Sequence, residues 1–320
     1  MSELFYKYPS IENTYRKAFV DEISILQEDR KDNWVVQEKI HGANFSVIYD
    51  VKFDQVNFGK RTGLLKPDEK FYEYQSLIPE LEEKMRRLKT QIPSTSSIVV
   101  FGELIGGYYP GLPSKGSRLQ KGIDYFNGKE FVAFDLMVDT RFLSNDEMKT
   151  HLKKVGFKLV PEIGVYNSFD EALKVDTNFS SLLPAQLGMQ PHPSPNICEG
   201  VVIRPNSCYW LQSHARVILK KKNPEFQEKT KAPREPIQQS HFVGAHDYIN
   251  TARMESAKSK LGDESGMTIG ELGKEMVRDI TEDYFKDNDK YLLEKDPEKV
   301  KKEFRKHISV LVFNFIKKNI

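Results

Sequence analysis

Several charged side chains stand at the ends of predicted strands, where they could take part in chemistry. They are Lys39 in EKIHGAN, Glu199 in EGVVIRP, and Lys220 with Lys222 in ILKKKN. A lysine amine becomes a nucleophile when neighbouring cations and partial desolvation lower its pKa, and carboxylates bind hard cations. Taken alone, each of these residues is ordinarily a solvated charge at a strand end. Their chemistry therefore depends on whether the fold brings them together.

The two outer lysines of ILKKKN are expected on one face of a strand. Successive side chains of a strand point to opposite faces, so Lys220 and Lys222 share a face and Lys221 points away from them. We interpret Lys221 as a solvated strand charge.

Strand patterns dominate the first 220 or so residues. Residues 34–50 are predicted to form two strands around the turn HGAN, because apolar side chains alternate after it. Further strand-like runs lie at 96–104, 130–138, 199–205 and 215–222. Capping-box patterns mark helix starts between them, Ser144 with Glu147 and Ser168 with Glu171. No strict βαβ repeat joins the strands, so we predict an α+β fold with an antiparallel-rich sheet.

A charged, proline-rich stretch over residues 220–240 is typical of a linker. It follows the last strand pattern and contains almost no apolar residue. We therefore predict a first domain over residues 1–235 and a small all-helical domain over residues 236–320.

Helix signals replace strand patterns in the second domain. Thr268 with Glu271 forms a capping-box pattern, and Asp296 stands as an N-cap before Pro297. Apolar residues then recur at helical spacing at Phe304, Ile308, Leu311 and Phe315.

Composition limits the class of protein and its partners. The 320 residues are 39% hydrophobic and 29% charged, which fits a soluble globular protein. No apolar run reaches the length of a signal peptide or a membrane span, so we expect a cytoplasmic monomer without a membrane partner. Cys198 and Cys208 lack the clustered spacing of a zinc site and are interpreted as reduced thiols. With a formal charge of only +2, a polyanionic partner would have to be held by local basic patches.

A set of short motifs follows one another along nearly the whole chain. They are KYPSIEN, EKIHGANFS, KRTG, FGEL, QKGIDY, FVAFD, EGVVIRP, RVILKKKN and, more weakly, SKLGD. Their order resembles the covalent nucleotidyltransferase superfamily of ATP-dependent ligases and RNA capping enzymes. It is most similar to the phage-type RNA ligase 2 family, which includes the trypanosome RNA-editing ligases. The resemblance implies an ATP-grasp-like nucleotidyltransferase domain followed by a helical domain.

The resemblance also implies a reaction and its cofactors. Lys39 would attack ATP to give lysyl-AMP, AMP would pass to an RNA 5′-phosphate, and a 3′-hydroxyl would displace it. Lys220 and Lys222 would balance the phosphate charge, and a divalent metal, Mg²⁺ or Mn²⁺, would be held by Glu199. RNA is the implied partner, and a nicked or bridged duplex is the substrate we favour.

Three further residues resemble the family's nucleotide-binding groups. Arg61 and Glu103 would hold the ribose and phosphate, and Phe134 would stack on adenine. From the residues alone, Arg61 is a turn residue, Glu103 a strand-end charge and Phe134 a core side chain.

The neighbours of the lysine in EKIHGAN complete the expected site. The same likeness places Glu38, Ile40 and Asn44 beside the nucleotide and ties His41 to work on RNA after lysine adenylylation. A structural, turn-forming role is the alternative for His41.

Some positions depart from the family pattern. Ala43 stands where related ligases often carry Thr, Arg204 stands where Lys is common, and the predicted loop 105–128 is longer than in the phage enzyme. These departures bear on substrate preference. The loop and residues 220–234 combine basic residues with aromatics or proline, which suits a phosphate backbone or, equally, a solvated loop.

Two alternatives remain open. A capping guanylyltransferase or a DNA ligase shares the lysine chemistry but would predict short strands after residue 240, where helix signals occur. A catalytically silent RNA-binding protein on the same scaffold is the other alternative, and the presence of all the charged motif residues argues against it.

Overall fold

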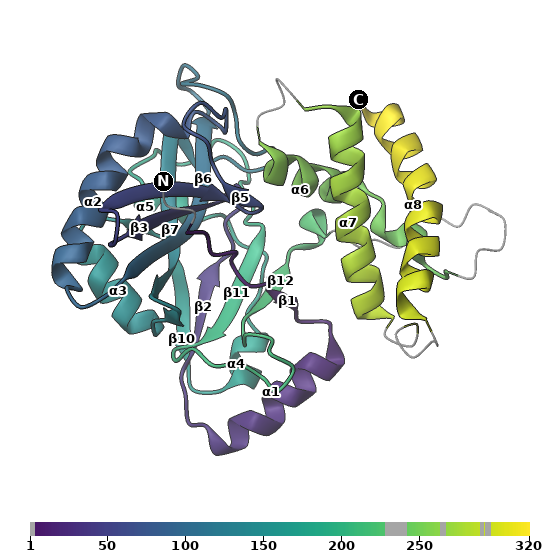
Figure 1. Ribbon diagram of the computed structural model, residues 1–320, viewed down its shortest axis with the longest axis horizontal. Helices are drawn as coiled ribbons and strands as arrows, with labels where there is room; N and C mark the ends of the chain where they lie inside the picture. The colour runs from purple at the N-terminus through teal and green to yellow at the C-terminus, as the bar shows by residue number, and fades with distance from the viewer. Residues whose placement is uncertain (1–3, 228–241, 263–266, 289–290, 292–295) are drawn as a thin grey trace. The chain divides into compact units, whose positions relative to one another are not determined.

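The chain divides into two compact units, Met1–Asn223 and Pro224–Ile320, in a computed structural model (Figure 1). The structure describes residues 4–227, 242–262, 267–288, 291 and 296–320. The domain boundary predicted between residues 235 and 236 lies outside these described residues.

One half of the first unit is a five-stranded sheet ordered β1–β12–β11–β2–β10. Its strands are β1 (Glu12–Asn13), β2 (Trp34–Glu38), β10 (Glu162–Tyr166), β11 (Gly200–Pro205) and β12 (Leu219–Lys222). All neighbours are antiparallel except β1 and β12. Helices α1 (Lys17–Asp29) and α4 (Phe169–Leu173) bury one face of this sheet through a core that includes Trp34 and Ile203.

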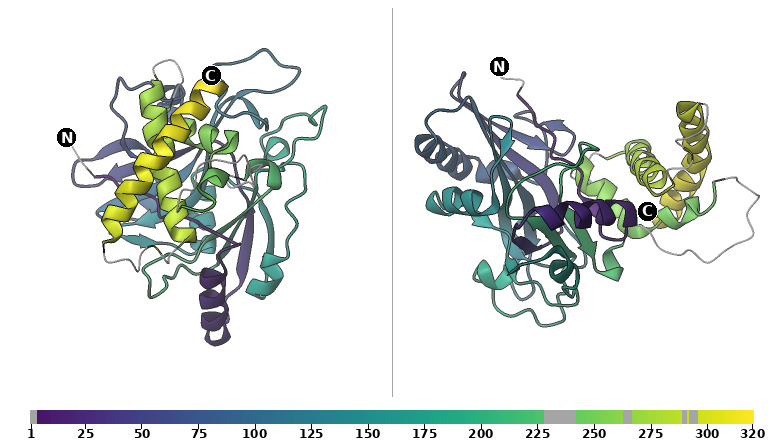
Figure 2. Two further views of the ribbon diagram at one scale, coloured as in Figure 1. Left: turned by 90° about the vertical axis from the view of Figure 1, so that its right-hand side faces the viewer. Right: turned by 90° about the horizontal axis from the view of Figure 1, so that it is seen from below.

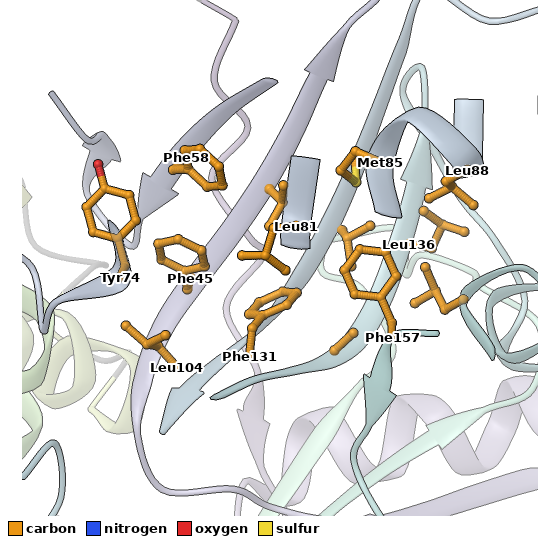
Figure 3. Packing of buried hydrophobic residues seen from close by; sticks show 14 of the residues in the cluster. Phe45, Phe58, Tyr74, Leu81, Met85, Leu88, Leu104, Phe131, Leu136 and Phe157 are labelled. Atoms are coloured by element: carbon orange, nitrogen blue, oxygen red, sulfur yellow. The ribbon is translucent and has the colours of Figure 1, made fainter. Parts of the chain in front are cut away.

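The other half is a seven-stranded sheet ordered β5–β4–β3–β6–β7–β8, with β9 beside β7. Its strands are β3 (Ala43–Asp50), β4 (Gln55–Lys60), β5 (Gly63–Leu64), β6 (Ser97–Tyr108), β7 (Phe126–Val138), β8 (Arg141–Phe142) and β9 (Lys158–Leu159). Helices α2 (Ile78–Gln91) and α3 (Asn145–Lys154) cover its outer face through an aromatic core (Figure 3). Two short helices, η1 (Tyr74–Leu77) and α5 (Leu183–Gln186), complete the unit. The predicted antiparallel-rich α+β fold is confirmed.

The inner faces of the two sheets meet in a separate core. It contains Ile48, Phe101 and Met137 from the larger sheet and Ile218 from the segment that leads into β12. The neighbours of Ile218 on both sides belong instead to the core under α1 and α4. This alternation directs Lys220 and Lys222 toward the larger sheet.

The connection predicted over residues 105–128 is shorter at both ends than expected. Strand β6 continues to Tyr108 and β7 begins at Phe126, and these two residues pair with each other. Two adjacent glycines in a sequence suggest a loop. Gly106 and Gly107 have φ angles of 106° and 95°, which favour glycine. In the structure they form an irregularity inside a paired strand, because a bulge accommodates such backbone angles.

The second unit is helical over its described residues. Its elements are η2 (Pro224–Phe226), η3 (Ala245–Tyr248), α6 (Thr251–Leu261), α7 (Ile269–Asp287) and α8 (Pro297–Asn319). Helices α7 and α8 run side by side (Figure 2) around a core in which the rings of Tyr284 and Phe304 stack 4.4 Å apart. The capping box of Thr268 with Glu271 forms as predicted.

The helix starts predicted elsewhere also form. Ser144 and Glu147 make a complete capping box at α3, and the Ser168 hydroxyl accepts from the backbone N–H of Glu171 at α4. Asp296 caps α8, with Pro297 at its first position. Both cysteines are free thiols, Cys198 buried and Cys208 partly exposed.

Within the residues that the structure describes, no helix is at once long enough and apolar enough to cross a membrane.

Candidate active site

Three charged side chains singled out in the sequence meet at one end of the five-stranded sheet. Lys39 follows β2, Glu199 precedes β11 and Lys222 ends β12. The Nζ atom of Lys39 lies 2.7 Å from Oε2 of Glu199, and the Nζ atom of Lys222 lies 2.9 Å from Oε1. Each oxygen of one carboxylate therefore has an ammonium partner.

Strand order explains this meeting. β11 lies between β2 and β12, and Lys222 is opposite Gly200. The backbone N–H of Lys39 donates to the Gly200 carbonyl at 2.9 Å. Gly200 has a φ of 146°, and a Cβ atom there would lie 2.2 Å from the carbonyl oxygen of Lys221. Only glycine lets β11 begin so close to β12, which places Glu199 between the two lysines.

The charge of Glu199 is fixed by its partners. Its side chain is only 3% exposed, and burial by itself would raise its pKa. Lys222 and Lys39 outweigh burial and lower the pKa of Glu199 to about 2. Lys39 is held in this ion pair, so the pair must open before its amine can attack an electrophile.

The turn after Lys39 lies tightly against β6. A Cβ atom on Gly42 would lie 2.4 Å from the carbonyl oxygen of Leu104. Nδ1 of His41 lies 3.7 Å from Oε2 of Glu199, so its imidazole belongs to the same cluster. The turn HGAN thus brings His41 to the carboxylate while it directs the chain into β3.

Glu103, a half-buried residue of β6, contributes a second carboxyl group. It pairs in register with Asn44 of β3. Burial raises the pKa of Glu103 to about 8, although Lys39 and Arg61 partly oppose the rise. Near neutral pH the group is therefore largely protonated and can donate as well as accept a hydrogen bond.

Arg61 and Phe134 are brought together by Tyr8, a residue of the KYPSIEN motif. Nη1 of Arg61 donates to the carbonyl oxygen of Tyr8 at 2.6 Å. The rings of Tyr8 and Phe134 meet edge to face, with centroids 5.0 Å apart. The two predicted nucleotide-binding side chains thus share one support.

A β-bulge directs Phe134 toward Tyr8. Phe101 pairs with Asp135 and Gly102 pairs with Ala133, which leaves Phe134 as the extra residue of β7. Phe134 and Asp135 are consecutive, yet both contact Tyr8. Strict alternation would have placed them on opposite faces.

Asp135 anchors a buried charge network between the sheets. Its carboxylate accepts from the Tyr8 hydroxyl at 2.8 Å, from Arg216 at 2.5 Å and from Arg204 at 3.3 Å. Arg204 belongs to β11, so the network ties the smaller sheet to β7 of the larger one. Arg204 is the position where related ligases often carry Lys, and its two donors reach both Asp135 and the Phe134 carbonyl.

Glu38 and Ile40, two residues predicted to lie beside the nucleotide, make other contacts or are buried. The carboxylate of Glu38 accepts from the Ser181 hydroxyl and from the backbone N–H of Leu182, and burial raises its pKa to about 7. Ile40 is buried. A nucleotide-binding role for Glu38 and Ile40 stays a prediction.

The interpretation of Lys221 as a solvated charge is wrong. Its Nζ atom donates to the carbonyl oxygens of Leu173 and Val175, at 3.0 and 2.8 Å. These carbonyls belong to the end of α4 and the residues after it, which the sequence pattern does not place beside β12. Lys221 does point away from its two neighbours, as predicted.

The donor set suits a metal that is shared with a substrate. Among the described residues, no three His, Cys, Asp or Glu side chains group closely enough to hold a metal ion by themselves. Mg²⁺ commonly binds one or two carboxylates together with substrate phosphates and water, and Glu199 fits that pattern.

Two packed sheets with a lysine, a buried carboxylate and a second lysine at one sheet end form a site that suits transfer of a nucleotidyl group. The chain belongs to the RNA ligase family, which it matches over residues 32–222. Residues 242–310 match the T4 RNA ligase 2 C-terminal family.

Named relatives include two trypanosome proteins. RNA-editing ligase 1, mitochondrial, of Trypanosoma brucei brucei is 31% identical over an alignment of 207 residues, and the match covers 53% of this chain and 44% of the relative. RNA-editing ligase 2, mitochondrial, of the same organism is 24% identical and covers 81% of this chain and 78% of the relative. This chain therefore spans less than half the length of editing ligase 1.

Solved structures of a Naegleria gruberi RNA ligase are also similar. A mutant with AMP and Mn has a TM-score of 0.46 at 16% identity and covers 71% of this chain and 60% of that one. A mutant with ATP and Mn has the same TM-score at 17% identity and the same coverage.

The substitution Glu199→Gln is expected to remove a pH-dependent part of the stability. The folded pKa of about 2 lies below the ordinary 4.5, so ionised Glu199 stabilises the fold above pH 4.5, by about 3 kcal/mol. This stabilisation is lost as pH falls toward 2. Urea unfolding at pH 7 and pH 3 should show a larger difference between wild type and variant at pH 7. Glu83→Gln, at an exposed position of α2, is the control, and an equal difference at both pH values would contradict the account.

Proposed function

We propose that this chain is an ATP-dependent RNA ligase that joins 3′-hydroxyl and 5′-phosphate ends through lysyl-AMP and RNA-adenylate intermediates. The observation that carries the proposal is the placement of Lys39 beside Glu199 and Lys222, in a chain of the RNA ligase family. The names of the trypanosome relatives support RNA as the substrate.

In the first step Lys39 releases one proton to solvent, its neutral amine forms a bond to the α-phosphorus of ATP, and the bond to pyrophosphate breaks. Lys39 first leaves its ion pair with Glu199. Lys222 stays beside the site, and Lys220 shares its strand face, so both can balance charge on the phosphates. Mg²⁺ or Mn²⁺ held by Glu199 would supply further neutralisation of phosphate charge.

The nucleotide is held by groups of the larger sheet. Arg61 and Glu103 bind the phosphate and ribose, and Phe134 offers its ring to adenine. In the later steps AMP passes to the RNA 5′-phosphate, and a 3′-hydroxyl then displaces it. His41, beside Glu199, supports these steps on RNA.

Helix α8 supplies a surface for the RNA backbone. It carries seven Lys and Arg residues against two Glu, a formal charge of 7 − 2 = +5, whereas the whole chain has +2. The rest of the chain is thus 2 − 5 = −3. The exposed basic residues are Lys299, Lys302, Arg305, Lys306, Lys317 and Lys318. Concentrated positive charge on one helix favours contact with phosphates.

Three finer features belong to the proposal. The substrate is a nicked or bridged duplex, the protein acts as a monomer, and its location is cytoplasmic. The two trypanosome relatives are named as mitochondrial proteins.

A sealing assay tests the proposed function. We expect the wild type to join a nicked RNA duplex with ATP and Mg²⁺, to join single strands at least tenfold more slowly, and to be inactive with GTP. Lys39→Ala should abolish joining, because no other amine replaces the nucleophile. Lys221→Ala is the control, because its side chain faces α4, and it should still seal. Closure with GTP alone would favour a capping-type enzyme, and faster closure of single strands would overturn the substrate class.

Charge reversal on α8 tests the RNA surface. The double substitution Lys302→Glu with Lys306→Glu should weaken RNA binding by about tenfold or more at low salt and reduce the salt slope of binding by roughly 1 to 2. Nitrocellulose filter binding at several salt concentrations measures both quantities. The matched control reverses the exposed Lys153 and Lys154 of α3, with the same change in net charge. An equal loss in both variants would mean that total charge, and not α8, governs binding.

A further inference from the structure

Tyr125, the last residue of the QKGIDY motif, is a buried residue beside the lysine turn, and the sequence assigns it no role. It directly precedes β7 and is fully buried. Its hydroxyl oxygen accepts a hydrogen bond from the backbone N–H of His41 at 2.9 Å. Burial, and after it the charge of Glu38, raise the pKa of Tyr125 well above its usual value, so the group is a neutral phenol.

Three separate parts of the unit hold the turn from Lys39 to Gly42. The N–H of Lys39 donates to the Gly200 carbonyl, and Gly42 packs against β6, where an added Cβ atom would lie 2.4 Å from the carbonyl oxygen of Leu104. The N–H of His41, between them, donates to Tyr125. The first two contacts are made with β11 and β6, so Tyr125 is the contact that fixes the middle of the turn.

The segment that leads to Glu199 also anchors Tyr125. The backbone N–H of Asp124 donates to the side-chain oxygen of Asn196 at 2.9 Å, and the Asn196 amide donates back to the Asp124 carbonyl at 2.7 Å. The Asp124 carboxylate contacts His192 at 3.3 Å. Asn196 stands three residues before Glu199, so one segment places both the carboxylate and the support of the turn.

We propose that Tyr125 is a positioning residue whose hydroxyl keeps Lys39 and His41 in place relative to Glu199. This inference rests on the proposed function. Without the hydroxyl, the His41 N–H loses this buried acceptor, and the turn shifts to regain a partner. Small displacements of a reacting group slow a reaction strongly without changing which groups bind the substrate.

Single-turnover formation of the labelled AMP adduct tests the inference in Tyr125→Phe. One lost hydrogen bond in a buried place should lower the rate constant about tenfold. The ATP concentration for half-maximal rate should stay within about twofold, and the final fraction of adduct should match the wild type. A loss of folded protein would lower that fraction instead of the rate constant.

Tyr109→Phe is the matched control. The hydroxyl of Tyr109 donates to the Gln190 carbonyl at 2.6 Å, and the side chain is 2% exposed, so the substitution removes a similar bond from the same connection. Its hydroxyl bonds to Gln190 and not to the turn, so the substitution should leave the rate constant near that of the wild type. An unchanged rate in Tyr125→Phe, or an equal loss in Tyr109→Phe, would overturn the inference.

The same experiment distinguishes a failure of the proposed function from a failure of the inference about Tyr125. A wild type without adduct would refute the proposed function, and with it the inference, whereas a normal adduct rate in Tyr125→Phe would refute the inference alone. If Tyr125→Phe does not fold, Asn196→Ala serves, because it releases Asp124 and leaves Tyr125 itself intact. A rate constant at least threefold lower supports the inference, and a wild-type rate overturns it.

Discussion

A buried carboxylate with an ammonium group on each oxygen is the interaction on which the site depends. An unpaired charge at the place of Glu199 would be costly, and Lys39 with Lys222 removes that cost. The pairing requires β11 to lie between β2 and β12 and a glycine to follow Glu199. The same ion pair restrains Lys39, the proposed nucleophile, while it stabilises the fold.

A second buried charge keeps the two sheets together near the site. Asp135 receives donors from Arg204 and Arg216 and from the Tyr8 hydroxyl. Tyr8 in turn contacts Arg61 and Phe134. Breaking such a network by removing one partner leaves the others buried and unpaired, which is strongly destabilising. Arg61 and Phe134, which we propose to bind the nucleotide, are therefore positioned through Tyr8 by a buried charge network.

Much of the fold was predicted from residues that lie close together in the sequence. The capping residues Ser144, Thr268 and Asp296 act through neighbours three positions away, so the sequence alone locates the helix starts. The alternation of side chains in ILKKKN likewise predicted which face of the strand carries Lys222. The order of the motifs indicated the family, which the match over residues 32–222 confirms.

Features that depend on residues far apart in the sequence were not predicted. The bulge at Phe134 depends on register with β6, and the contact of Lys221 depends on where α4 ends. Tyr125 lies in the QKGIDY motif, but its role was not predicted, because its partner His41 lies 84 positions away. Strands β4 and β10 were missed, because each is only five or six residues long and contains a glycine, so its alternation covers only two apolar positions.

The central claim is that Lys39 carries AMP during the reaction. Peptide mapping by mass spectrometry after incubation with ATP and Mg²⁺, followed by removal of free nucleotide, tests it directly. The account predicts one AMP per protein, bonded to the Lys39 side chain. AMP on Lys220, on Lys222 or on no residue would contradict it.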